Sequence, residues 1–131
     1  MSRRIAATEI YVATVNYSDS SPKTLFTLPA NTVVVDAFVQ VTTAFDDATA
    51  TIDIGDDSDP DGIVPSSSLD LTTTGFQALK ENEKGVYLWD GTNKKMKVYD
   101  ADTDIKATIN AGSSTAGQIK VYVVVLDIRY L

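Results

Sequence analysis

Residues 29–62, PANTVVVDAFVQVTTAFDDATATIDIGDDSDPDG, decide the fold class of this chain. Apolar residues recur there at alternate positions, which is the periodicity of a pleated strand with one buried face. We expect two faces for residues 33–45, one with Val33, Val35, Ala37, Val39 and Val41, the other with Val34, Asp36, Phe38, Gln40 and Thr42. The turn Asp46-Asp47 leads into a second strand at residues 49–54. Two strands joined by a short turn predict a β-hairpin.

The rest of the chain repeats this pattern of short strands separated by turn residues. The other expected strands are residues 3–16, 23–28, 85–89, 96–99, 105–109 and 118–130. Residues 90–95 and 110–117 are expected to be the loops of two further hairpins. About eight or nine short strands at regular spacing predict a β-sandwich or barrel, and we favour a jelly roll.

Two segments between these strands have weaker patterns. Residues 56–68 are rich in Asp, Ser and Pro and are predicted to form a long loop with at most one helical turn. Residues 69–79 form either a strand broken at Gly75 or an extended connection.

Length and composition point to one all-β domain. The chain has 131 residues, enough for one hydrophobic core but too few for two. Thr, Val, Asp and Ala dominate while Glu, Leu and Met are scarce, which favours strands over helices. We therefore predict a single β-sandwich domain over residues 1–131, with residues 1–16 as its first strand or as an N-terminal arm.

The last expected strand, residues 118–130, is apolar on both faces. One face carries Ile119, Val121, Val123 and Val125, and the other carries Val124, Leu126 and Ile128. Two explanations are open for the second face. The strand is central and covered by the second sheet and a loop, or this face is buried against another copy of the chain.

The chain contains neither cysteine nor histidine. Without these residues it can form no disulfide, no cysteine-ligated zinc site and no Ser-His-Asp or Cys-His catalytic centre. Asp100, Asp102 and Asp104 share one short turn, whereas the carboxylates of a glycosidase flank the sugar from opposite sides of a cleft. We therefore expect a protein that is not an enzyme, has no catalytic residues and requires no cofactor.

The charge and hydropathy of the chain limit its partners. A formal net charge of −7 at pH 7 disfavours nucleic acid, because phosphate binding needs clustered Lys and Arg. Thr8 and Glu9 interrupt the apolar run that a signal peptide needs, and no stretch of about 18 apolar residues is present. The sequence predicts a chain made in the cytoplasm, with neither membrane nor nucleic acid among its partners.

The acidic stretch between Asp46 and Asp61 contains seven aspartates and no basic residue. Asp57, Asp59 and Asp61, followed by Gly62, have the spacing of a calcium-binding loop. That motif is incomplete, because Ser68 replaces the bidentate glutamate and Pro60 interrupts the loop. We predict a solvated acidic turn without a bound metal, with calcium at the three aspartates as the alternative. The negative edge could also match a basic patch on a partner or keep neighbouring copies apart.

A few other side chains are candidates for binding. Trp89 with Tyr87 could form an aromatic platform for a sugar, although a single Trp in a strand is more often part of the core. Arg3 and Arg4 could lie on the acidic surface of a neighbouring copy. Lys94, Lys95 and Lys97 are expected to keep a hairpin tip soluble.

Three segments resemble small β-sandwich structural proteins of tailed bacteriophages. They are FTLPANTVVVDAFVQVTTAFDDATATIDIGDDSDPDGI (residues 26–63), DLTTTGF (residues 70–76) and AGQIKVYVVVLDI (residues 116–128). Residues 1–25 lie outside the clearest match. The resemblance brings no catalytic motif with it, so it implies no catalytic residues.

The resemblance implies a capsid decoration (cement) protein with a jelly-roll domain. Such a protein forms a homotrimer on the outer surface of the phage head and stabilises contacts between subunits of the major capsid protein. Proteins of this kind also serve as tail, baseplate or head-fibre components, which is one alternative. A carbohydrate-binding module of a receptor-binding apparatus is an alternative from another class.

Overall fold

The structure, a computed structural model, describes residues 7–130. Their strands are β1 (Thr8–Asn16), β2 (Lys23–Leu28), β3 (Thr32–Thr43), β4 (Thr51–Gly55), β5 (Gly75–Ala78), β6 (Val98–Tyr99), β7 (Thr103–Asn110) and β8 (Gln118–Asp127). The helices in this range are short 3-10 turns, namely η1 (Ser66–Ser68), η2 (Glu81–Glu83) and η3 (Ile128–Tyr130).

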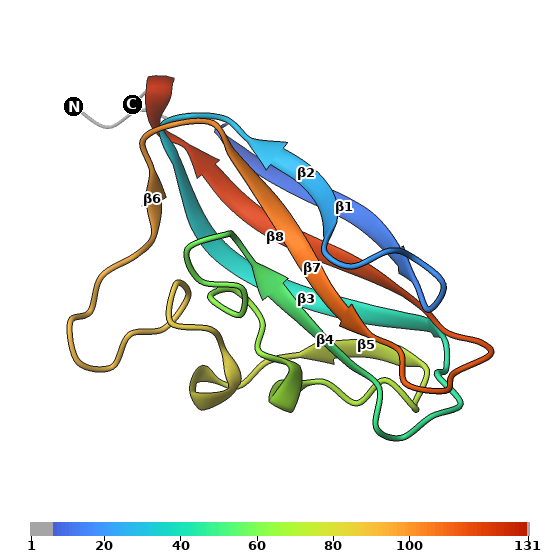
Figure 1. The fold of residues 1–131 in the computed structure, drawn as a ribbon. Coiled ribbons are helices and arrows are strands. Elements are labelled where there is room, and N and C mark those ends of the chain that lie inside the picture. Colours follow the sequence, from blue (N-terminus) through green and yellow to red (C-terminus); the bar gives the residue numbers. More distant parts are fainter. Residues whose placement is uncertain (1–6, 131) are drawn as a thin grey trace.

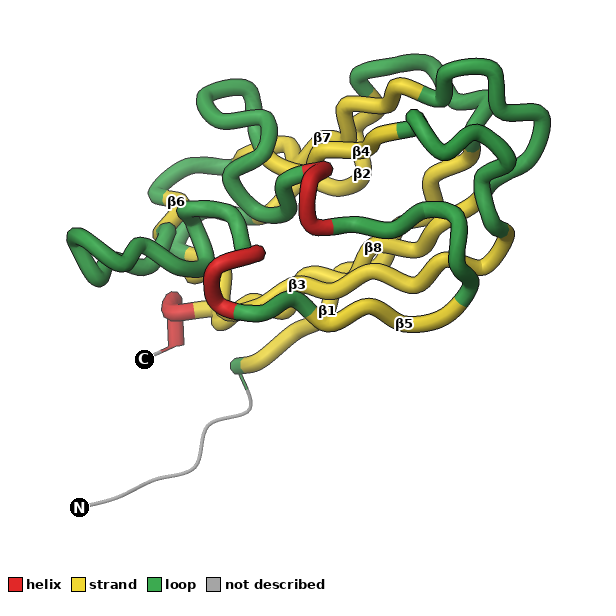
Figure 2. Tube along the Cα trace, turned by 90° about the horizontal axis from the view of Figure 1, so that it is seen from below, coloured by secondary structure: helices red, strands yellow, loops and turns green. Residues whose placement is uncertain are grey.

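The strands form two antiparallel sheets. One has five strands in the order β1-β8-β3-β5, with β6 also paired to β3, and the other has three strands in the order β2-β7-β4. The two sheets pack face to face (Figure 1), and Figure 2 shows them as two layers, with loops at their ends and the segment that carries η1 and η2 running alongside them. This arrangement confirms the predicted all-β sandwich. The loop of residues 56–68 contains a helical turn, η1, as predicted, and of residues 69–79 only Gly75–Ala78 form a strand.

The pairing of the strands is that of a jelly roll, a long hairpin rolled into two sheets. In such a roll the first strand pairs with the eighth, the second with the seventh and the third with the sixth. β1 pairs with β8, β2 with β7 and β3 with β6. β5 departs from this scheme, because it pairs with β3 instead of β4. Val64 takes its place beside β4 through a bridge to Ile54.

The predicted hairpin of residues 33–45 and 49–54 is wrong, because β3 and β4 belong to different sheets. At the end of β3, Phe45 is buried in the core and its backbone N–H donates to the Leu71 carbonyl at 2.9 Å. The chain then crosses to the three-stranded sheet, where Ile52 and Ile54 are buried in the same core. Residues 111–117 likewise cross between sheets, from β7 to β8, so the hairpin predicted there is also wrong.

The predicted faces of β3 hold only for its second half. A register shift between Val34 and Asp36 inserts one extra residue opposite β8. Val34 is therefore buried together with Ala37, while Val35 is exposed. Such a β-bulge exchanges the faces of the strand. Three consecutive valines carry no signal for its position, which explains the error.

Residues 85–89 form turns instead of the predicted strand. Gly85 packs so closely on Gly62 that a Cβ atom at Gly85 would lie 2.1 Å from the Gly62 carbonyl oxygen. The N–H of Tyr87 donates to that same carbonyl at 2.8 Å, and the N–H of Trp89 donates to the Gly85 carbonyl at 3.0 Å. These bonds curl the segment. The hairpin predicted at residues 90–95 is wrong for this reason, and only Val98–Tyr99 of the strand predicted after it forms.

β8 is the central strand of the five-stranded sheet, between β1 and β3. Its inward side chains, Ile119, Val121, Val123 and Val125, are buried under the three-stranded sheet. Its outward side chains, Tyr122, Val124 and Leu126, are half-buried. In Figure 2 no loop drawn in green crosses the outward side of β1, β8 and β3.

Candidate interaction surfaces

The outward side of the five-stranded sheet carries apolar side chains where a solvated sheet carries polar ones. We call this side the outer face. Its larger apolar side chains are those of Ile10, Val12, Phe38, Phe76, Tyr122, Val124 and Leu126. Ile10, Val12 and Phe76 are 58%, 51% and 65% exposed. A contiguous exposed apolar patch on a sheet is typical of an interaction site.

Three aromatic rings form the centre of the outer face. The rings of Phe38 and Tyr122 stack with centroids 4.7 Å apart and planes 12° apart. The Phe76 ring lies 6.3 Å from Phe38 and 6.0 Å from Tyr122. The Tyr122 hydroxyl also donates to Gln40 Oε1 at 3.1 Å. These contacts hold the rings in place within one chain, so little side-chain entropy is lost when a partner covers them.

The sequence predicted only part of this surface. The apolar second face of residues 118–130 is present at Val124 and Leu126, whereas Ile128 lies beyond the strand in η3. Phe38 and Phe76 were missed as members of a common patch. Pairing of β3 with β5 and β8 brings their rings together, and the period-two pattern of one strand contains no information about its neighbours.

Few charges lie on the outer face. At its strand positions the charged side chains are Asp36 and Lys120. Asp36 forms an ion pair with Lys84 at 3.4 Å. The strand positions of this face therefore carry one positive and one negative charge, on a chain whose formal net charge is −7.

Asp56 is a buried carboxylate that ties loops to the sandwich. It accepts hydrogen bonds from the hydroxyls of Tyr99 at 2.8 Å and Tyr87 at 3.1 Å. It also accepts from the backbone N–H groups of Ser58 at 3.0 Å and Asp59 at 2.8 Å. Burial, together with the Asp56 charge, raises the pKa of Tyr87 to about 12. The Lys97 ammonium lies over both tyrosine rings, 4.6 Å and 5.0 Å from their centroids, so it is not the solvated hairpin lysine that the sequence predicted.

The three aspartates of the calcium alternative do not share one partner, because Asp57 pairs with Lys106 while Asp59 and Asp61 contact each other. Asp57 is exposed and pairs with Lys106 at 2.9 Å, which raises the pKa of Lys106. The hydrogen bond between the carboxyls of Asp59 and Asp61, together with burial and their mutual repulsion, raises the pKa of Asp59. Among residues 7–130 no three acidic side chains are grouped so that they could hold a metal ion. The solvated turn without metal stays a prediction.

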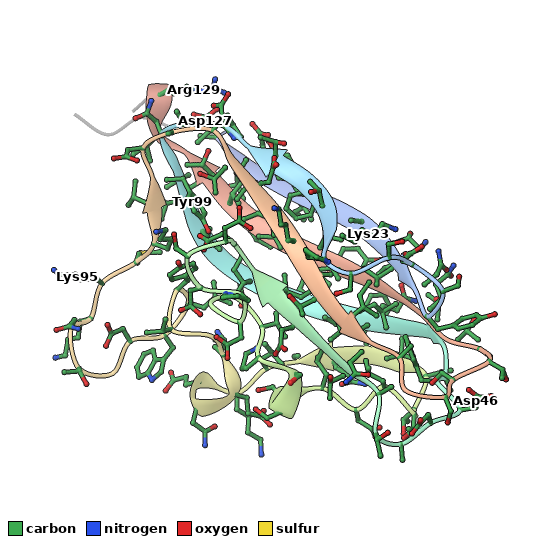
Figure 3. The ribbon with its side chains drawn as sticks, in the orientation of Figure 1. Lys23, Asp46, Lys95, Tyr99, Asp127 and Arg129 are labelled. Atoms are coloured by element: carbon green, nitrogen blue, oxygen red, sulfur yellow. The ribbon has the colours of Figure 1, made fainter. Side chains whose placement is uncertain are left out.

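Asp46 and Asp47 connect the β3–β4 crossing to the β7–β8 crossing. Asp46 accepts from the backbone N–H of Thr115 at 2.7 Å, and Asp47 accepts from that of Ser113 at 2.7 Å. The hydroxyl and N–H of Thr49 donate to Asp47 as well. These bonds lower the pKa of both carboxyls. In Figure 3 Asp46 lies at the end of the sandwich opposite Asp127, where the Arg129 guanidinium lowers the pKa of the Asp127 carboxyl.

Asp100, Asp102 and Asp104 line an open hollow of about 540 Å³ together with Asp56 and Asp57. Asp102 accepts from the Ala30 N–H at 2.9 Å, and Asp104 accepts from the Thr27 hydroxyl at 2.6 Å. These bonds fix the turn between β6 and β7 against the end of β2.

Trp89 lies outside the core, although a single Trp in a strand is more often part of it. Its side chain is 47% exposed in the loop between η2 and β6, which stands away from the sheets around Lys95 in Figure 3. With Met96, Lys94 and Lys95 it lines a mostly apolar hollow of about 430 Å³. Tyr87 packs edge-on against Tyr99 at 6.4 Å and is held by Asp56. The two aromatic residues therefore do not form a common platform.

Two further expectations concern the N-terminal arginines and the membrane. Arg3 and Arg4, proposed for a neighbour's acidic surface, fall in residues 1–6. Within residues 7–130 no helix has the length and apolar character to cross a bilayer.

Comparison with known proteins identifies structural relatives but no sequence family. No protein-family model and no curated protein matches the chain. A chain in the capsid asymmetric unit of cyanophage Pam1 is similar, with a TM-score of 0.68 and 16% identity over 96% of this chain and 90% of that one. A chain in the acidic stable capsid of Helicobacter pylori bacteriophage KHP30 has a TM-score of 0.64 and 10% identity, over 92% of this chain and 88% of that one. At such identities the likeness establishes the fold, so nearly this whole chain shares the fold of chains found in two phage capsids.

Proposed function

We propose that this chain is a non-enzymatic structural protein of a phage virion. More specifically, it is a capsid decoration (cement) protein that binds the outer surface of the head. The observation that supports this most is the near-complete match, over 96% of the chain, to a chain of a phage capsid asymmetric unit. The resemblance of residues 26–63 to phage structural proteins supports it independently, because it lies in the sequence and not in the fold.

In this proposal the chain acts as a homotrimer whose partner is the major capsid protein. Each bound trimer adds contacts that exist only in the assembled shell, so binding shifts the equilibrium towards the assembled state. A trimer presents three equivalent contacts at once, and its avidity therefore exceeds the affinity of a single contact. Neither catalysis nor a cofactor is required for such reinforcement.

Counting copies on purified particles tests the proposal. A decoration protein should be present in hundreds of copies per particle, whereas a tail, baseplate or head-fibre component should be present in a few to some tens. Quantitative mass spectrometry against an isotope-labelled standard of this chain gives that number. Labelled protein added to heads that lack it should bind across the head surface in electron micrographs. The decorated heads should also open at a higher temperature than heads without the protein. Low copy number with label at the tail would contradict the proposal.

A carbohydrate-binding module is the second candidate, since Trp89 is exposed beside an apolar hollow. Exposed tryptophan is a common stacking surface for sugar rings. A glycan array probed with this chain and with Trp89→Ala separates the readings. Binding that Trp89→Ala abolishes favours sugar recognition, and an empty array favours the capsid proposal. Val86→Ala, an exposed apolar side chain of the same loop outside the hollow, controls for a general change in the loop.

A further inference from the structure

The outer face exposes apolar side chains that a partner could bury, and its charges indicate which kind of partner can bind there. Its exposed members are Ile10 and Val12 from β1 and Phe76 from β5, and the half-buried Tyr122 and Val124 of β8 lie on the same face. Asp36 is neutralised by Lys84, which leaves Lys120 as the remaining charge at the strand positions of the face. The outer face therefore lacks the clustered charges that would attract a strongly charged partner.

A second copy of this chain does fit such a surface. Two chains of formal charge −7 repel each other, whereas the one carboxylate at the strand positions of the outer face, that of Asp36, is paired with Lys84. The outer face combines exposed apolar side chains with few charges, so two copies can meet there with little repulsion. Apolar surface buried there supplies the driving force.

We propose that copies of this chain pack against one another through the outer face. The inference rests on the homotrimer of the proposed function and names the surface that forms it. In a closed three-fold ring a surface that faces the axis contacts both neighbours. The β1 half of one face, with Ile10 and Val12, then meets the β5 half of the next, with Phe76.

Single lysine substitutions in each half test this arrangement. Val12→Lys and Phe76→Lys replace side chains that are more than half exposed in one chain, so each variant should keep the fold of the wild type. Each should convert the trimer into a monomer, measured by size-exclusion chromatography with light scattering at micromolar concentration. Met96→Lys is the matched control, because Met96 is 56% exposed on a loop away from the sheet. It should remain trimeric.

A second measurement covers the case of a variant that fails to fold. The chain has no cysteine, so a single introduced thiol can be labelled without background. Val12→Cys should react at least tenfold more slowly with a thiol reagent than Met96→Cys in the assembled protein, and at a similar rate once the protein is diluted to monomer. Equal rates at high concentration would overturn the inference.

The other outcomes are equally decisive. Trimers that persist in Val12→Lys and Phe76→Lys would show that another surface joins the copies. A wild-type chain that is monomeric but binds heads only with an intact outer face would assign the face to the capsid, against this inference but in favour of decoration. A wild-type trimer that dissociates in both variants yet never binds heads would support this inference while the proposed function fails.

Discussion

Asp56 shows why a buried carboxylate can persist in a small sandwich. Four hydrogen bonds satisfy it, two of them from tyrosine hydroxyls on segments far along the chain. A buried charge is costly unless its hydrogen bonds are made, so loss of one donor is felt strongly.

Tyr99→Phe removes the shorter of the two tyrosine bonds while leaving the ring in place. We expect the free energy of unfolding to fall by roughly 1–3 kcal/mol, the usual cost of losing a hydrogen bond to a charged group. Urea denaturation measures this difference. Tyr17→Phe, which also removes a hydroxyl from a partly buried ring, should change stability by less than half as much. Equal effects of the two substitutions would refute the role given to Asp56.

Asp47 provides a pH dependence with a definite sign. Its pKa lies below the ordinary value of 3.8 because the folded chain donates hydrogen bonds to the carboxylate. Its contribution is therefore complete above about pH 5 and is lost as the pH falls below 4 towards the lowered value. We expect wild-type stability to fall over that acid range and Asp47→Asn to be less stable at pH 7 with a shallower acid decline. Urea denaturation at stepped pH checks this, with Asp100→Asn as the control for removal of an exposed charge. Parallel pH curves for wild type and Asp47→Asn would contradict it.

The acidic loop yields a prediction about calcium. If Asp57, Asp59 and Asp61 form a solvated turn, calcium and sodium chloride at equal ionic strength should shift the melting temperature alike, because both act by screening. We expect that result, since Asp57 is already paired with Lys106. A calcium-specific rise that disappears in the double variant Asp59→Asn with Asp61→Asn would establish a site, and a chelator would then reverse it.

At the scale of elements, Gly117 determines how the chain enters β8. Its φ angle is +149°, and a Cβ atom there would lie 2.5 Å from the buried ring of Phe45. Gly117→Ala therefore combines backbone strain with overpacking and should destabilise the protein by roughly 2–4 kcal/mol. Gly91→Ala, where the nearest atom would be 3.6 Å away, should have little effect. Thermal and urea denaturation of both variants compare them, and a neutral Gly117→Ala would show that this end of the sandwich can relax.

The same scale explains which predictions were confirmed. Strands were found wherever β-branched residues alternate between turn residues, as in β2, β7 and β8, because that pattern depends on local chemistry alone. Their partners were mispredicted where the chain changes sheets at Phe45 and at residues 111–117. The bulge at Val34, the curled segment at Gly85 and the aromatic centre of the outer face all depend on contacts between distant residues, which no local periodicity encodes.

At the scale of the whole molecule, charge and apolar surface oppose each other in association. Copies that carry a net charge of −7 repel one another, and salt screens this repulsion. If the outer face joins the copies, raising sodium chloride from about 20 mM to 300 mM should strengthen the trimer and lower the concentration at which it dissociates. Sedimentation velocity over a dilution series measures that concentration. A trimer that weakens with salt would indicate an interface held by ion pairs instead.

The position of β8 also governs when this surface first exists. β8 lies between β1 and β3 and joins them into one sheet. It is the last strand to be synthesised in the part of the chain that the structure describes. While the ribosome still holds residues 118–127, the nascent chain has two separated strand edges and no continuous sheet between them. If the outer face joins the copies, self-association therefore has to wait until β8 is made, and a product truncated before β8 should neither complete the sheet nor join an assembly of full-length chains.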